Sequence, residues 1–211
     1  MNALKQLFVV CMLGWALAVQ AADGSHAYFA FDTGPAFQQD LKVKEALGVS
    51  VSAGKIGFDP GIRFDVSGGY NFNDTLAVGI ETGVLYNNIH RLTSGGVSAS
   101  PAAIFGADVS FFQVPILANA IFTPPLRSPL RPFVGAGAGG VASVIAGSTI
   151  DTESDFTFAY EGIAGFAYAI APRIDIGLTY KFLGATDHKF DSIKTGETYA
   201  HSILATFTFK F

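Results

Sequence analysis

The segment Tyr199-Ala-His-Ser-Ile-Leu-Ala-Thr-Phe-Thr-Phe-Lys-Phe211 alternates between an apolar and a polar side. The apolar side carries Tyr199, Ile203, Ala205, Phe207, Phe209 and Phe211, and the other side carries Ser202, Thr206, Thr208 and Lys210, with Leu204 as an apolar exception. Successive side chains of a β-strand point to opposite faces, so the two sets point in opposite directions. This pattern fits a strand of a membrane barrel, whose aromatic side contacts lipid, or a strand that covers a soluble core.

Residues 1–21 predict a secretory signal peptide, cleaved after Ala21 or, as an alternative, after Ala18. A basic residue precedes the apolar run Leu7–Val19, and small residues follow the run. A membrane-anchoring helix is the competing interpretation, but the run is shorter than the roughly 20 residues that cross a bilayer. We therefore expect export through the Sec pathway and one mature domain over residues 22–211.

Composition excludes several functions for the mature chain. The only Cys, the only Trp and both Met residues lie in the signal segment: Cys11, Trp15, Met1 and Met12. The mature domain therefore has no disulfide, no thiol chemistry and no soft metal ligand. Removal of Lys5 from the 13 basic residues leaves 12 against 17 acidic ones, a formal charge of −5. A nucleic-acid binder needs a clustered basic face, so we expect no nucleic-acid partner.

Hydrophobic residues make up 50% of the chain, yet after residue 21 they never form a run of transmembrane-helix length. They recur instead in short alternating segments, which is typical of barrels. Alternation and turn residues predict eight strands, at 26–35, 59–71, 75–87, 109–122, 132–145, 156–170, 173–184 and 199–211. The predicted fold class is all-β, an eight-stranded antiparallel up-and-down transmembrane β-barrel.

The connections between these strands support this fold through their lengths. Connections after the second, fourth and sixth strands are short or proline-rich (71–74, 123–131, 171–172), and the others are longer (36–58, 88–108, 146–155, 185–197). A barrel with both termini on the periplasmic side has tight inner turns and longer outer loops. Within the first long loop, Asp40–Leu47 fits either a helical turn or a strand that continues above the membrane.

Charged residues recur on the side expected to face the interior: Arg63, Asp65, Glu81, Glu161, Arg173, Asp175, Lys181 and Lys210. Pairing neighbouring strands antiparallel about the turn that joins them places Glu81 opposite Asp65 and near Arg63. The same pairing about Pro172 places Glu161 near Lys181. Eight strands enclose an interior only wide enough for side chains, and buried charges cost free energy unless they are paired. We expect a structural network that plugs the lumen; a paired-carboxylate active site or a gated ion path is the competing interpretation.

Other candidate sites are weaker. His201 and Ser202 suggest a hydrolase of the kind that modifies lipid A at the rim of a barrel, but neighbours in a strand point to opposite faces. The four histidines lie in separate segments without the short spacing of metal ligands. The Gly-rich run 135–140 lies inside a predicted strand, whereas a dinucleotide fingerprint lies between a strand and a helix. We expect no catalytic residue, no metal and no cofactor.

Aromatic residues cluster near both ends of the predicted strands. The inner set is Tyr70, Phe72, Phe122, Phe133, Phe207, Phe209 and Phe211, and the outer set is Tyr86, Phe111, Phe156, Phe158 and Tyr199. Amphipathic rings favour the two membrane interfaces, so these sets predict two aromatic girdles.

The segments Phe112-Gln-Val-Pro-Ile-Leu-Ala-Asn119 and Pro132-Phe-Val-Gly-Ala-Gly-Ala138, with the terminal Phe211, resemble the small outer-membrane β-barrel family of Gram-negative bacteria. This is the OmpA/OmpX-like and opacity-type group, and the resemblance extends over residues 22–211 as a pattern rather than a strict motif. It implies insertion by the outer-membrane assembly machinery, which in such proteins recognises an aromatic last strand, here carrying Phe207, Phe209 and Phe211. This chain departs from the two-domain members of the group, since we expect no peptidoglycan-binding domain after the barrel.

Members of that group serve as structural envelope proteins, surface adhesins or poorly conducting pores. We therefore expect a non-enzymatic outer-membrane protein with a structural or surface-interaction role. Its expected partners are outer-membrane lipid, lipopolysaccharide and, through the long loops, extracellular ligands. The alternatives are a narrow porin-like channel for ions or small solutes and, less favoured, a lipid A-modifying barrel enzyme or a soluble lipocalin-like binding protein.

Overall fold

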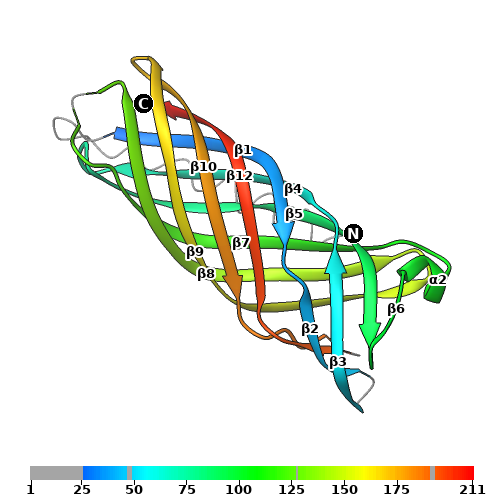
Figure 1. The fold of residues 1–211 in the computed structure, drawn as a ribbon. Coiled ribbons are helices and arrows are strands. Elements are labelled where there is room, and N and C mark those ends of the chain that lie inside the picture. Colours follow the sequence, from blue (N-terminus) through cyan, green and yellow to red (C-terminus); the bar gives the residue numbers. More distant parts are fainter. Residues whose placement is uncertain (1–25, 47–48, 127, 191–192) are drawn as a thin grey trace, which may run out of the picture.

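The computed structural model describes residues 26–46, 49–126, 128–190 and 193–211, so the predicted signal peptide at 1–21 lies outside the described residues. Eight long strands form the wall: β1 (His26–Gln38), β4 (Gly61–Asn71), β5 (Leu76–Ser94), β7 (Val109–Phe122), β8 (Leu130–Gly147), β9 (Ile150–Ala171), β10 (Ile174–Ala185) and β12 (Thr198–Lys210). Each pairs antiparallel with the next, and β12 pairs with β1 to close the ring (Figure 1). The predicted eight-stranded barrel is confirmed.

The alternation along each strand decides which side chains face inward. In β12, Ser202 and Leu204 are buried while Ile203, Ala205 and Phe207 are exposed. Large apolar side chains are exposed in the same way along the other strands of the wall. An apolar exterior around a mixed interior is the arrangement of a barrel that contacts lipid. Among the described residues, no helix is long and apolar enough to cross a membrane.

The two described ends of the chain lie at one end of the barrel, together with the connecting residues 72–75, 123–126, 128–129 and 172–173. Tyr28 pairs with Lys210 across the seam between β1 and β12. In the first of these turns, the backbone N–H groups of Thr75 and Leu76 both donate to Asn73 Oδ1 at 2.8 Å. We call this the inner end, because short turns mark the periplasmic side of such barrels.

Additional strands extend the sheet beyond the wall at the outer end (Figure 1). Here β2 (Leu41–Ala46) and β3 (Val49–Phe58) form a hairpin, which pairs with β11 (Ile193–Thr195) on one side and with β5 on the other. β6 (Val97–Ala99) and the short helix α2 (Pro101–Phe105) complete this end. The two alternatives for residues 40–47 are thereby decided for residues 41–46, which form a strand.

One expected long loop is a tight turn. β8 and β9 are 18 and 22 residues long, and only residues 148–149 connect them, where the sequence predicted a loop over 146–155. About 10 residues suffice for a strand to cross the membrane, so both strands project beyond it. Polar residues are compatible with a strand in water, which is why the segment had the composition of a loop.

The projecting strands enclose an apolar cluster, which we call the outer cluster. It consists of Leu41, Ile56, Phe58, Ile89, Val109, Phe111, Ile145 and Phe190. Phe111 was predicted in the outer girdle, but it is only 1% exposed and its ring lies 5.4 Å from that of Phe58. The prediction was wrong because the inward face of the extension is packed like a soluble core, with an apolar rather than a polar interior.

The ladder between β1 and β12 is interrupted at Pro35. Pairing stops at Thr33 with Ala205 and resumes at Ala36 with Ser202, because proline has no N–H to donate. At the neighbouring Gly34 an added Cβ would lie 2.1 Å from the carbonyl oxygen of Ile203. The closing seam therefore depends on a glycine at position 34.

We predict that Gly34→Ala lowers the free energy of unfolding by roughly 1–3 kcal/mol, the usual cost of forcing an extra carbon into a packed site. Gly162→Ala is the matched control, because nothing lies within 4 Å of its added Cβ. Urea unfolding of the refolded barrel, followed by circular dichroism, measures both. Equal stability of the two variants would contradict the close packing of the seam.

Candidate functional site

Arg63 on β4 lies at the centre of the buried charges and bonds to three carboxylates. Its Nε donates to Asp65 at 2.7 Å, and its Nη2 donates to Glu81 at 3.0 Å and to Glu161 at 2.5 Å. All four side chains are almost fully buried. Since β4 and β9 lie on opposite walls of the ring, the bond from Arg63 to Glu161 crosses the lumen.

Lys181 on β10 holds a second set of carboxylates. Its Nζ donates to Asp32 and Asp65 at 2.9 Å each and to Glu81 at 2.7 Å. Asn119 donates from Nδ2 to the same oxygen of Glu81, Oε2, at 3.0 Å. We call the charged residues of these two sets the central network; they are Arg63, Lys181, Asp32, Asp65, Glu81 and Glu161, which gives two cations for four carboxylates.

The sequence analysis predicted most, but not all, of the contacts in the central network. Arg63, Asp65 and Glu81 are in contact as expected, but the ion-pair partner of Glu161 is Arg63 rather than the expected Lys181. The guanidinium reaches the opposite wall because the lumen is narrow, and reflection between adjacent strands cannot show such a contact. Asp32 was missed, although its alternation with the outward Phe31 could have identified it as an interior residue.

A second ion cluster lies nearer the inner end. Asp175 forms an ion pair with Lys210 Nζ at 2.6 Å and accepts a hydrogen bond from Arg131. Arg173, predicted in the interior, is exposed, because it lies in the turn after Pro172 and β10 begins only at Ile174. The strand alternation does not extend into that turn, and Arg131 of β8 pairs with Asp175 instead.

Between these clusters and the inner turns lies a cavity of about 160 Å³, which we call the inner cavity. Tyr28 and Phe133 line it, and both rings use space left by glycines: an added Cβ at Gly79 would lie 2.4 Å from the Tyr28 hydroxyl, and one at Gly165 would lie 2.6 Å from the Phe133 ring. Phe133 was predicted in the inner girdle, but it lines the interior. Its partner glycine is on β9, which the local sequence could not show.

Apolar side chains fill the lumen on the outer side of the central network. We call this set the leucine layer; it consists of Leu85, Leu117, Val141, Ala159, Leu183, Ala185 and Ala200. The order can be followed along β5, where the inward residues toward the outer end are Glu81, Leu85, Asn87 and Ile89. Charged, apolar, polar and again apolar strata therefore succeed one another through the barrel.

His188 lies in the outer stratum, next to the outer cluster. It is fully buried, stacks on Phe190 with ring centroids 5.6 Å apart, and contacts Thr198 at 3.3 Å. Burial lowers the pKa of His188, and the nearby carboxylate of Asp155, 3.6 Å away, opposes this shift. The neutral ring is therefore one of the groups that fill the outer end.

Two arrangements could suggest a metal site or a serine nucleophile: the carboxylates around Lys181, and the neighbours His201 and Ser202. One carboxylate oxygen each of Asp32, Asp65 and Glu81 lies within 4.8 Å of the other two, but the ammonium of Lys181 is within 2.9 Å of all three residues and occupies the position of a cation. His201 points outward and contacts Tyr180 at 2.7 Å, whereas Ser202 is buried inside. His201 and Ser202 point to opposite faces, as expected.

We predict opposite outcomes for two substitutions in the central network. Lys181→Met leaves three buried carboxylates without their ammonium and should lower the free energy of unfolding by about 3–5 kcal/mol. Asp32→Asn removes one of the excess negative charges and should leave stability unchanged or raised. Urea unfolding in lipid vesicles measures both, and equal destabilisation would contradict the imbalance of charge.

Comparisons with known proteins agree with this geometry. The family model for the outer membrane protein beta-barrel domain matches residues 8–211. The solved structure of Neisserial surface protein A is 18% identical with a TM-score of 0.61, over 90% of this chain and 100% of that chain. OprG from Pseudomonas aeruginosa is 13% identical with a TM-score of 0.55, over 88% and 97%.

A comparison with the curated proteins found no match. The two likenesses concern the fold, since both identities are low, and both structures are outer-membrane barrels. The family match extends over nearly the whole chain and includes all the strands of the wall. The resemblance inferred from the residues is confirmed, and the chain belongs to the outer-membrane protein β-barrel domain family.

Proposed function

We propose that this protein is a non-enzymatic outer-membrane barrel with a structural or surface-interaction role, and that its lumen does not conduct. The observation that carries this proposal is the succession of buried strata between the two ends. An ion that crossed the barrel would have to separate the ion pairs around Arg63 and Lys181. It would then have to pass the leucine layer without its hydration shell, which is costly in an apolar environment.

The placement of polar groups supports a role without catalysis. Catalysis by a serine needs a base within hydrogen-bond distance of its hydroxyl. Here His201 is outside the wall and Ser202 inside it, and each cation of the central network already contacts three carboxylates. The family also places the barrel in the outer membrane, and we propose that residues 1–21 direct its export through the Sec pathway.

A narrow channel is the second candidate, and the inner cavity is the observation that favours it. The cavity extends from the inner turns, at Asn73 and Thr123, to the carboxylates of Asp32 and Glu81. A solute could occupy this part of the lumen without disturbing the network. Passage through the barrel would additionally require the leucine layer to move.

Single-protein recordings in planar bilayers test the closed lumen. We expect no stable conductance for the wild type, and none for Glu81→Ala, because the leucine layer is unaffected by that change. The double variant Leu85→Gly/Leu183→Gly on an E81A background removes the large side chains of the leucine layer and weakens the central network, and it should conduct. Stable ohmic steps from the wild type would refute the proposal and favour the channel.

We also propose that Phe207, Phe209 and Phe211 form the signal that the assembly machinery recognises. Phe207 and Phe209 alternate with inward-facing residues of β12, and all three rings are exposed on the outer surface of the barrel. An exposed aromatic row on the last strand is accessible before the seam with β1 is complete. The lipid-facing exterior is likewise where we propose contact with outer-membrane lipid and lipopolysaccharide.

Phe211→Ser should reduce the fraction of protein that reaches the outer membrane in folded form by several-fold. Phe122→Ser is the matched control, since Phe122 is also an exposed aromatic residue near the inner end, on β7. Heat-modifiable mobility of the membrane fraction on unboiled gels measures assembly in cells, and refolding of purified chains into vesicles measures intrinsic folding. If both variants assemble equally, the signal does not reside in the terminal aromatic residue.

A further inference from the structure

The inner cavity ends at the central network, which carries an excess of negative charge. The network has four carboxylates for two cations, and Asp32 and Glu81 of this set line the cavity. The neighbouring ion cluster adds the carboxylate of Asp175 and the cations Arg131 and Lys210. Taken together, the two clusters contain five carboxylates and four cations. The charged groups beside the cavity are therefore one positive charge short.

Asp32 has a carboxylate oxygen that no group of the protein engages. Its Oδ2 accepts a hydrogen bond from Lys181 Nζ at 2.9 Å, whereas its Oδ1 has no partner among the described residues. The side chain is only 6% exposed. A buried acceptor without a donor costs free energy, and native structures rarely leave one unpaired. The free oxygen therefore indicates a donor that comes from outside the protein.

The side walls of the cavity are largely apolar. Tyr28 and Phe133 lie along them in the space left by glycines, and the other apolar lining includes Ala30, Ile121 and Ile163. Aromatic rings attract cations, and aliphatic side chains favour carbon over water. The volume of about 160 Å³ holds a charged group with a few carbon atoms attached. A matching ligand therefore has one positive end and a short carbon chain.

A primary ammonium suits this end of the cavity better than a quaternary ammonium or a metal ion. Its N–H groups can donate to Asp32 Oδ1, whereas a quaternary ammonium has no N–H. A metal ion needs several oxygen ligands around one point. Among the described residues, the one acidic group of that kind is Asp32, Asp65 and Glu81. Lys181 already lies between these carboxylates.

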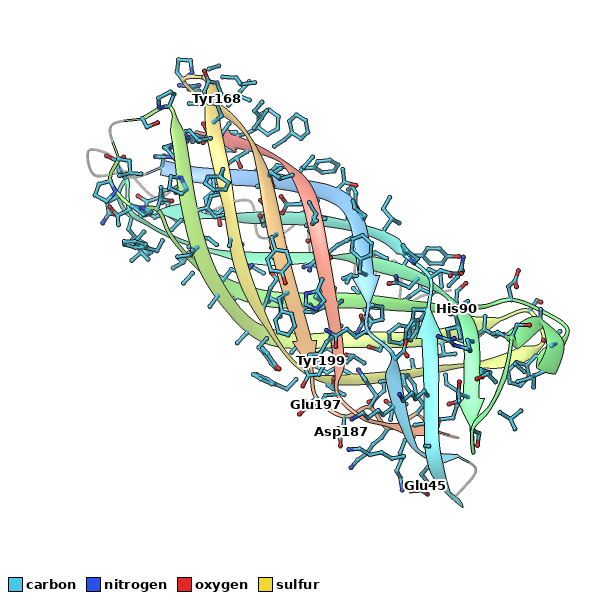
Figure 2. The ribbon with its side chains drawn as sticks, viewed as in Figure 1. Glu45, His90, Tyr168, Asp187, Glu197 and Tyr199 are labelled. Atoms are coloured by element: carbon cyan, nitrogen blue, oxygen red, sulfur yellow. The ribbon has the colours of Figure 1, made fainter. Side chains whose placement is uncertain are left out.

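The cavity is reached from the inner end of the barrel. Figure 2 shows Tyr168 at this end and Glu45 at the other. Asn73 and Thr123 of the inner turns line the mouth of the cavity, and the central network with the leucine layer closes its far side. A solute from the periplasm can therefore enter without any movement of the leucine layer.

We propose that the inner cavity is a binding site for a small primary alkylammonium ion that enters from the periplasmic side. The ammonium donates to Asp32 Oδ1 and supplies the missing positive charge, and the carbon chain lies against Tyr28 and Phe133. This site goes beyond the structural or surface-interaction role, since it adds a ligand to the interior. It does not depend on whether the lumen conducts.

The test uses the refolded mature barrel in octyl glucoside and an amine-free phosphate buffer, and it follows binding by amide chemical shifts. The probes are n-butylammonium, n-butanol, tetramethylammonium and potassium chloride at matched ionic strength. We expect saturable shifts with n-butylammonium at Gly79 and Gly165, which lie beside the two rings. The other three probes should bind at least about tenfold more weakly, since each lacks the charge, the N–H donors or the carbon chain. Equal affinity for any of them would overturn the proposal.

Asp32→Asn should weaken binding of n-butylammonium by about tenfold, because it replaces a charged acceptor with a neutral one. Glu161→Gln is the matched control, since it removes the same charge from the central network but does not line the cavity. It should weaken binding by less than about threefold, because its charge acts only from a distance. Equal weakening by the two variants, or none by Asp32→Asn, contradicts direct contact at Asp32. Heat-modifiable mobility verifies that each variant is folded.

Conductance of the same preparations separates this site from the proposed function. If the wild type conducts while n-butylammonium binds selectively, the closed lumen is refuted and the ammonium site stands. If the lumen is closed and n-butylammonium binds no better than n-butanol, the ammonium site is refuted and the closed lumen stands.

Discussion

The structure depends on two long cations that reach across a narrow barrel. Arg63 and Lys181 lie on β4 and β10 and together bond to carboxylates from β1, β4, β5 and β9. A buried charge without a partner costs several kcal/mol, so the circumference of the barrel is restricted to what these side chains can span. A wider ring would separate them from their carboxylates, and a narrower one would have no room for them.

The position of the charges also explains why the leucine layer is apolar. With the carboxylates and cations of the central network gathered on its inner side, this layer has no charges to solvate and is filled with leucine, valine and alanine. On the inner side, glycines provide the space that Tyr28 and Phe133 occupy. Large residues on one strand are thus matched with small residues on its neighbours, as close packing requires.

The sequence predicted the eight strands, the alternation of their faces and most of the interior charges, because a period of two is visible in any single strand. It did not predict the partner of Glu161, which comes from the opposite wall. It misplaced Arg173, because the alternation of a strand does not show where a turn begins. It misplaced Phe111, because alternation does not show where the polar interior changes to an apolar one. It misplaced Phe133, because alternation does not show which neighbouring strand has a glycine beside a large ring. The contact between Arg63 and Glu161 joins strands remote in sequence, and the other features depend on where strands begin and on how neighbouring strands pack.

The sequence separation of these contacts has a consequence for how the protein folds. Hydrogen bonds of the network join residues 98, 116 and 149 positions apart, and the closing seam joins β1 to β12. Contacts of such high order form slowly. A half-built sheet would leave carboxylates facing lipid, so bilayer entry and ring closure must be nearly simultaneous. The kinetics should accordingly show one cooperative, slow phase, with charge pairing as its last event.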